Sequence, residues 1–256
     1  MFKNIYIDRK DNSFKLWLTN GKVVHSEFKC RSWEEKEGLV GAAYKTIHGV
    51  PVSPVLRSMW EEREDIRNGR MRHEIDIQSE IRILSEYYQN TEVLDFKIDE
   101  FNIAAFDIEV ENGKGFPEPA LAERAINLIS IHCSKQKKYM VWGLKPVDEN
   151  RLYKLIEERS DYYTDVKKVY ERFGKLELHK NYEYVHCQSE RELLEMFFQY
   201  CSESGIDIYT GWNSNSFDFP YIVNRCKRIN VYNYTKLSPV GKVYLKETLN
   251  EYKNRK

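Results

Sequence analysis

Residues 102–110 are the most constraining stretch of the sequence, because two acidic side chains interrupt an otherwise apolar run at alternate positions. The apolar character predicts a central strand of a sheet, and successive side chains along a strand point to opposite faces. Asp107 and Glu109 are therefore expected on one face and the apolar side chains on the other. Two carboxylates this close to a core repel each other and lose hydration, and a divalent cation such as Mg²⁺ relieves both penalties. The alternative is an ordinary exposed strand end with two solvated acids.

A second motif follows a strand expected at 206–210. The segment Thr-Gly-Trp-Asn at 210–213 turns the chain, and Phe-Asp-x-Pro-Tyr at 217–221 enters a helix with Pro in its first turn, where a missing N–H costs little. An acid at the carboxyl edge of a strand lies where open α/β sheets bind ligands. Asp218 is thus expected at a ligand cleft, and Asn213 is expected to bind a sugar or phosphate oxygen across it. For Trp212, a place in the core is an open alternative.

Strand and helix signals divide the chain into two domains, 1–100 and 101–256. The first is predicted to be α+β: a β-meander with an Asn-Gly turn at 20–21, then helical stretches at 31–48 and across 65–90. The second is predicted to be α/β, with strands alternating with helices in a mixed sheet flanked by helices. Its strands are expected at 102–110, 125–133, 138–142, 184–187 and 206–210, and its helices in an insertion at 145–182, at 189–202 and at 217–227.

The formal charge is balanced, with 40 basic and 40 acidic residues, yet residues 222–256 carry nine Lys and Arg against two Glu. This basic end fits an electrostatic footprint for phosphates, and the alternative is a solvated terminus. Five scattered cysteines without a Cys-x-x-Cys pair indicate reduced thiols of a cytosolic protein, neither a disulfide framework nor a zinc site. No apolar run approaches the roughly 20 residues of a membrane helix, and the first residues lack a secretory signal pattern. We therefore expect a cytoplasmic protein without a membrane partner.

Taken together, the motifs resemble family B DNA polymerases, and above all the replicative enzymes of tailed bacteriophages. The resemblance rests on Phe-Asp-Ile-Glu-Val at 106–110, Gly-Phe-Pro-Glu-Pro at 115–119, the segment 210–221, and Leu-Ser-Pro-Val-Gly-Lys-Val at 237–243. It covers residues 101–243 and is only positional over the first hundred. It implies a ribonuclease-H-like 3′–5′ exonuclease domain that removes misincorporated nucleotides during DNA replication, preceded by an α+β N-terminal domain.

The resemblance also implies the chemistry and the residues of the site. In the family, two Mg²⁺ or Mn²⁺ ions held by carboxylates act together: one activates a water and the other stabilises the leaving 3′ oxygen. By position, the catalytic and metal-binding acids are Asp107, Glu109 and Asp218, and the substrate-binding residues are Asn213, Phe116, Phe217 and Tyr221. Phe116 corresponds to an aromatic residue that stacks on a base of the frayed strand, and its alternative role is a loop anchor packed on the sheet. The implied partners are the single-stranded primer 3′ end, the template and the remaining polymerase polypeptide, in the host cytoplasm if the chain is phage-encoded.

Two parts of the family pattern have no match. The third exonuclease motif pairs a Tyr with an Asp four residues later, and no Asp follows Asp218. The polymerase motifs of the palm are absent as well. We therefore expect either the N-terminal part of a longer polymerase or one subunit of a split polymerase, with a third carboxylate from a missing segment or a partner chain. The alternatives are a non-catalytic module that binds single-stranded nucleic acid or assembles with a polymerase, and a freestanding proofreading exonuclease.

Overall fold

The computed structural model describes residues 1–36, 43–70, 72–90, 97–148, 150–151, 154 and 182–245. The chain divides into two compact units, Met1–Glu100 and Phe101–Lys256. The helical insertion expected at 145–182 lies almost entirely outside the described residues. Within the described ranges, every helix is too short or too polar to cross a bilayer.

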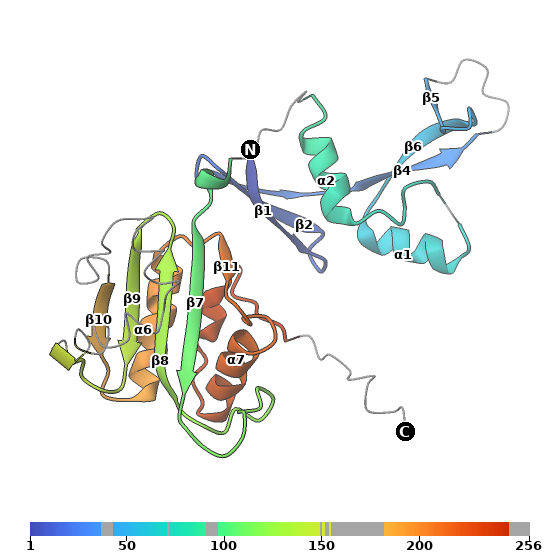
Figure 1. The fold of residues 1–256 in the computed structure, drawn as a ribbon. Coiled ribbons are helices and arrows are strands. Elements are labelled where there is room, and N and C mark those ends of the chain that lie inside the picture. The colour runs from blue at the N-terminus through green and yellow to red at the C-terminus, as the bar shows by residue number, and fades with distance from the viewer. Residues whose placement is uncertain are drawn as a thin grey trace. The chain divides into compact units, whose positions relative to one another are not determined.

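The first unit contains two three-stranded antiparallel sheets, β1-β2-β3 and β4-β6-β5, and two α-helices in its described part (Figure 1). The meander expected near the N-terminus is confirmed, and Gly21 adopts a φ of +82° in the turn after β2, a conformation that glycine adopts without steric cost. The elements are β1 (Phe2–Asp8), β2 (Ser13–Leu18), β3 (Val23–Glu27), β4 (Cys30–Glu35), β5 (Tyr44–Lys45), β6 (Pro51–Arg57), α1 (Met59–Arg67), α2 (Ser79–Tyr87) and the 3₁₀-helix η1 (Ile98–Glu100).

The helix expected at 31–48 is wrong over the residues that the structure describes there. Cys30 and Ser32 are buried, whereas Arg31 and Trp33 are half-buried, which is the two-residue alternation of a strand. β4 pairs with β6 along its whole length, and this non-local pairing overrides the helix propensity of the segment. The helical stretch expected across 65–90 is not continuous: α1 extends into it only as far as Arg67, and α2 covers Ser79–Tyr87.

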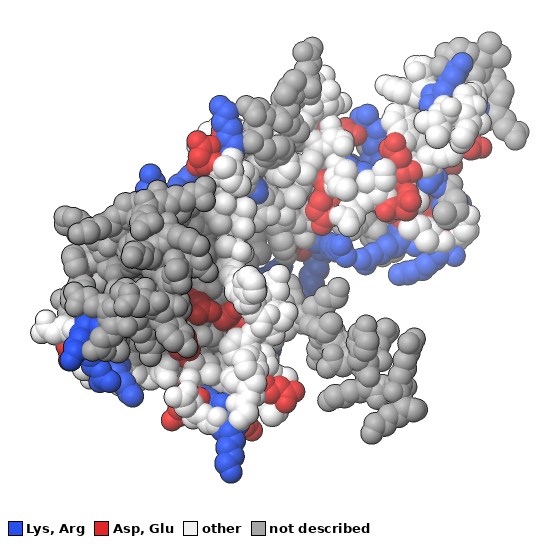
Figure 2. All heavy atoms as spheres, viewed as in Figure 1, with Lys and Arg blue, Asp and Glu red and all other residues white. Residues whose placement is uncertain are grey.

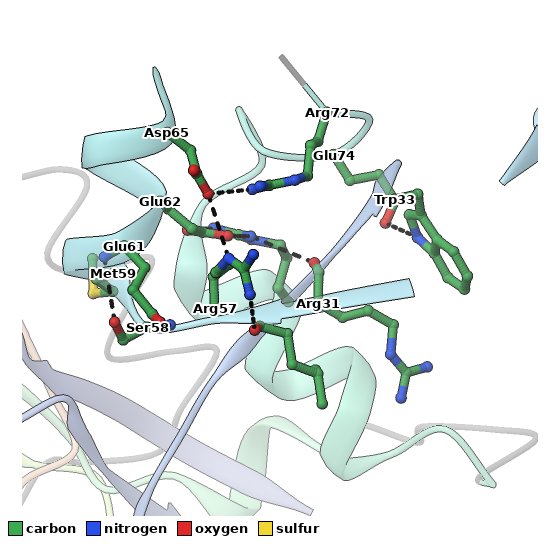
Figure 3. Close-up of polar contacts among 12 residues, drawn as sticks. Arg31, Trp33, Arg57, Ser58, Met59, Glu61, Glu62, Asp65, Arg72 and Glu74 are labelled. Atoms are coloured by element: carbon green, nitrogen blue, oxygen red, sulfur yellow. Dashed lines mark hydrogen bonds and ion pairs between the residues drawn. The ribbon is translucent and has the colours of Figure 1, made fainter. Parts of the chain in front are cut away.

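Buried ion pairs fix α1 within the first unit (Figure 3). The Asp65 carboxylate lies 2.7 Å from the Arg72 guanidinium and 3.5 Å from that of Arg57, and the Arg72 guanidinium holds the pKa of Asp65 below its usual value. Arg82 of α2 donates two hydrogen bonds to Glu62 of α1, at 2.5 and 2.8 Å. The Glu62–Arg82 pair therefore joins α1 to α2, whereas the Asp65 pairs join α1 to the end of β6 and to Arg72 in the segment after the helix.

The second unit is built on a five-stranded mixed sheet of order β10-β9-β8-β7-β11. β8 is antiparallel to both β7 and β9, whereas β10 runs parallel to β9 and β11 runs parallel to β7. The elements are β7 (Ile103–Val110), β8 (Ile126–Cys133), β9 (Lys138–Gly143), β10 (Tyr182–His186), α6 (Glu190–Glu203), β11 (Ile208–Thr210), α7 (Asp218–Arg228) and η2 (Asn233–Leu237). This is a mixed α/β architecture, as the sequence predicts.

The core of the second unit lies between this sheet and the helices α6 and α7, which cover the same face (Figure 1). Phe106 of β7 is buried between them, with its ring centroid 6.2 Å from that of Phe197 on α6 and 4.7 Å from that of Phe219 on α7. The side chains of Asp107 and Glu109 alternate with the buried ones and are exposed. The alternation expected along this strand is therefore confirmed, and the two acids point away from the helices.

Candidate active site

The candidate site lies beside β7, just beyond the point where β11 ends. β11 pairs with β7 only over Ile103–Ala105, so the remainder of β7 has no strand neighbour on this side among the described residues. The chain leaves the sheet at Gly211, where a Cβ atom would lie 2.6 Å from the carbonyl oxygen of Phe106. The side chain of any other residue at this position would push the loop away from the strand, which explains sterically why the second motif has a glycine here.

Asp218 is the first residue of α7 and lies at this free stretch of β7, where it is only 2% exposed. Burial raises the pKa of its carboxyl, and the negative charge of Asp107 raises that pKa further. A hydrogen bond with the backbone of Ile108 acts in the opposite direction. The fold therefore brings two acids from distant parts of the sequence close enough to repel each other.

Glu109 lies two residues beyond Asp107 on the same exposed face of β7. Figure 2 shows acidic atoms exposed in the middle of the second unit, on the side that faces the viewer. In the part of the chain that the structure describes, no three His, Cys, Asp or Glu side chains are placed to hold one metal ion together. The structure thus joins Asp107 and Asp218 electrostatically and does not join Glu109 to them.

The chemistry of the donor pair fits a divalent cation. Asp107 and Asp218 offer hard carboxylate oxygens, and their mutual repulsion is relieved by a positive ion between them. Mg²⁺ usually binds proteins through one or two carboxylates and completes its shell with water and phosphate oxygens. The pair therefore matches the protein ligands that one such ion uses, whereas a second ion needs further ligands.

Three aromatic rings form a row beside the acids, from the surface into the core. Phe116 is 78% exposed, and its ring centroid lies 5.0 Å from that of Phe217, which lies 5.3 Å from that of Tyr221. Tyr221 is fully buried, and its hydroxyl donates to the carbonyl of Arg124 at 2.8 Å and accepts the N–H of the same residue at 3.1 Å. Phe116 is too exposed to be a loop anchor, whereas Tyr221 is directed away from the surface and holds a loop.

The turn before α7 carries the other residues of the second motif. Asn213 is exposed, and its carbonyl accepts the N–H groups of Ser216 and Phe217 at 3.1 and 2.8 Å, which forms the turn that starts the helix. Trp212 is fully exposed, so the core alternative for this residue is wrong. The Asn213 side chain is thus available to a ligand and is held on a short, hydrogen-bonded loop.

Sequence reasoning missed Arg124 and Arg225, which bind backbone carbonyls of the loop between β7 and β8. Every residue has a backbone carbonyl, so the sequence does not show which carbonyls a side chain will bind. An arginine near short apolar runs has the same sequence pattern as a solvent-exposed arginine. The one available signal was Gly113, since a glycine outside a tight turn often marks a close approach of another group.

Comparison with known proteins identifies the class to which this fold and site belong. The family described as DNA polymerase family B, exonuclease domain, matches residues 61–255, and the chain belongs to this family. Among its relatives, the DNA-directed DNA polymerase of Escherichia phage RB69 is 33% identical over 175 residues, which cover 66% of this chain and 19% of the relative. The DNA-directed DNA polymerase of Enterobacteria phage T4 is 29% identical over 220 residues, covering 82% of this chain and 23% of the relative.

The similarity extends to herpesviruses. The DNA polymerase catalytic subunit of Alcelaphine herpesvirus 1 is 34% identical over 134 residues, which cover 52% of this chain and 10% of that subunit. The chain spans about a fifth of the length of the two phage relatives that it matches.

Proposed function

We propose that the second unit is the proofreading exonuclease of a DNA polymerase and removes nucleotides from the 3′ end of a single-stranded primer. The observation that carries the proposal is the buried carboxylate of Asp218 beside that of Asp107 at the free stretch of β7. Repulsion between two carboxylates lowers the stability of the folded protein, and a cation bound between them removes that repulsion. Membership of the exonuclease-domain family supports the same reaction.

Each residue has a part in the proposed hydrolysis. Asp107 and Asp218 hold a divalent ion, and Glu109 joins them on the same face of β7 when DNA and metal are bound. Mg²⁺ or Mn²⁺ held by these acids would supply activation of a water and stabilisation of the leaving 3′ oxygen. Phe116 stacks on the terminal base and Phe217 supports it from behind, while Asn213 hydrogen-bonds a sugar or phosphate oxygen.

The proposal includes a third carboxylate from outside residues 1–256. The two-ion mechanism needs ligands for both metals, and the sequence lacks the Asp of the third family motif. The template, the primer and the rest of a polymerase polypeptide are the partners proposed on the same grounds. The fold proposed for the second unit is ribonuclease-H-like, since its mixed sheet has an antiparallel β7-β8-β9 core with parallel strands at both edges.

A second candidate function is a non-catalytic module that binds single-stranded nucleic acid. The observation that favours it is that only two acids are electrostatically joined within the described residues. In this case Phe116 and Asn213 bind DNA as above, and no bond is broken.

Degradation of a 3′-labelled single-stranded DNA in Mg²⁺ or Mn²⁺ separates the two functions. We expect metal-dependent loss of the label with the parent chain and none with Asp107→Ala or Asp218→Asn. Glu183→Gln is the matched control, because Glu183 is an exposed acid on the outer strand β10. Label loss by Asp107→Ala at the parent rate would refute the assignment of the acids. Salt-dependent DNA binding without cleavage in either metal would favour the non-catalytic module.

Binding of Mn²⁺ followed by electron paramagnetic resonance tests the metal site without relying on activity. The parent chain and Glu183→Gln should reduce the signal of free Mn²⁺ to the same extent. Asp107→Ala should bind the ion more weakly, because one carboxylate and its charge are lost.

A further inference from the structure

The loop between β7 and β8, residues 111–125, carries Phe116 and is called here the Phe116 loop. Three side chains of α7 hold it through its backbone, and their spacing places them on one face of the helix. The contacts are Tyr221 with the N–H and carbonyl of Arg124 at 3.1 and 2.8 Å, Asn224 with the carbonyl of Pro119 at 3.0 Å, and Arg225 with the carbonyls of Ala122 and Glu123 at 3.2 and 2.9 Å. The end of the loop is thus fastened to the helix that begins with Asp218.

Arg124 connects this fastened end to the start of the loop. Its guanidinium donates to the carbonyl of Gly115 at 3.1 Å and to the carbonyl of Lys114, the two residues before Phe116. Gly113 lies so close that a Cβ atom there would be 2.8 Å from the central carbon of the guanidinium. The arginine therefore links the end of the loop to its start, and Phe116 directly follows the two residues whose carbonyls it binds.

The backbone conformation at Ala122 indicates that this arrangement is imposed by contacts. Ala122 is fully buried and has a φ of +41°, a left-handed conformation that alanine rarely adopts. Such a conformation persists only where the surroundings enforce it. Here Arg225 donates hydrogen bonds to the carbonyls of Ala122 itself and of Glu123, and Arg124 follows directly in the chain.

We propose that Arg124 is a positioning residue, which fixes the two carbonyls before Phe116 and so presents the Phe116 ring to the terminal base of a single-stranded 3′ end. The DNA part of this inference rests on the proposed function, whereas the ordering of the loop is a property of the chain itself. A ring that is ordered before DNA arrives loses less conformational freedom on binding, so affinity rises without an additional contact to DNA. Each terminal nitrogen of Arg124 donates to a loop carbonyl, so two of the five N–H groups of the guanidinium hold the loop before DNA binds.

Hydrogen exchange of the full chain without DNA tests the ordering. In Arg124→Gln, the hydrogen-bonded amides of the loop, those of Glu111, Leu121 and Ala122, should exchange roughly tenfold faster than in the parent, because the loop opens more often once two carbonyl anchors are lost. Arg191→Gln is the matched control: Arg191 also donates to two backbone carbonyls, those of Ile229 and Asn230, and lies on α6. Unchanged exchange of these three amides in Arg124→Gln would overturn the proposal. If Arg124→Gln folds poorly, Gly113→Ala replaces it, since the added methyl displaces the guanidinium while its charge remains.

Binding of an oligonucleotide with 2-aminopurine at its 3′ end, in Ca²⁺, tests the consequence. Arg124→Gln and Phe116→Ala should each weaken binding roughly tenfold, and the double variant should bind no more weakly than Phe116→Ala. The slope of affinity against salt concentration should not change. Two results would mean that Arg124 contacts a phosphate and would overturn the positioning role. One is a double variant whose loss of affinity is the product of the two single losses, and the other is a salt slope that Arg124→Gln lowers by about one. No binding by the parent chain would contradict the proposed function, and the exchange result would still decide the ordering.

Discussion

Replacing Arg225 by Met removes a side chain of α7 that contacts both α6 and the Phe116 loop. The Arg225 guanidinium lies 2.8 Å from each carboxylate oxygen of Glu190 at the start of α6, and the two side chains are only 11% and 13% exposed. Glu190 also accepts the N–H of Ile126 at 2.7 Å. After the substitution, Glu190 retains this hydrogen bond and loses the positive charge that balances it.

The magnitude follows from the burial of the pair. Removing one partner of a buried ion pair typically costs about 3–5 kcal/mol, because the remaining charge stays desolvated without compensation. For a unit of this size each kcal/mol lowers the melting temperature by roughly 2–4 °C, so the expected fall is roughly 6–20 °C. Two loop carbonyls, those of Ala122 and Glu123, lose their donor as well and place the cost in the upper part of this range.

Unfolding in urea, followed by circular dichroism, measures the effect. Lys138→Met is the control, because Lys138 and Glu183 form an ion pair at 2.6 Å whose side chains are 41% and 53% exposed, and such a pair contributes at most about 1 kcal/mol. The double variant Arg225→Met/Glu190→Gln should recover part of the loss, since no charge is left unpaired and the glutamine oxygen still accepts the Ile126 N–H. If Arg225→Met costs no more than Lys138→Met, the reasoning from burial is refuted.

Three further outcomes are expected. Asp218→Asn should make the metal-free protein more stable at neutral pH, because burial and Asp107 raise the pKa of Asp218 in the folded state. This gain in stability should shrink as the pH falls through the raised pKa and vanish below the ordinary value of 3.8. Equal urea midpoints of the two proteins at neutral pH would contradict this prediction. Arg82→Met leaves Glu62 buried without its partner in the first unit and should lower the free energy of unfolding by about 3–5 kcal/mol, a prediction that fails if the urea midpoint is unchanged. Cys201, whose burial raises its pKa to about 12, should be alkylated only after denaturation, and modification of the folded chain seen by mass spectrometry would be the contrary result.

The elements that the sequence predicts well are those whose signal is local. Along β7 the alternation of acids and apolar residues has the period of a strand, so the face of each side chain follows directly. At the start of α6, Ser189 precedes Glu192 by three residues, and its hydroxyl accepts the Glu192 N–H at 3.2 Å, as a helix cap does. The positions of Asp107 and Asp218 follow from the same local signals, because the end of a strand and the start of a helix are both recognisable.

The features that the sequence does not predict depend on partners far along the chain. β4 is a strand because it pairs with β6, and nothing in its own residues requires this. Tyr221 belongs to a motif for which the sequence predicts a binding role, yet its hydroxyl is directed to the Arg124 backbone. The sequence of the motif is the same for either orientation of this side chain. Side-chain contacts to backbone atoms are independent of the residue type that supplies the carbonyl, so pattern analysis cannot find them.

The site exists because β11 is short. Had β11 continued along β7 past Ala105, its backbone would occupy the place where the Ile108 backbone bonds to Asp218, and the acid would have no space beside the strand. Gly211 ends β11 at this point by bringing the loop against the Phe106 carbonyl, and α7 then begins with Asp218. The same helix binds the Phe116 loop through Tyr221, so one rigid element sets the distance between the buried acid and the exposed ring. The proposed proofreading reaction needs a fixed spacing between the terminal base and the phosphodiester to be hydrolysed, and this arrangement of β11, the turn and α7 would provide it.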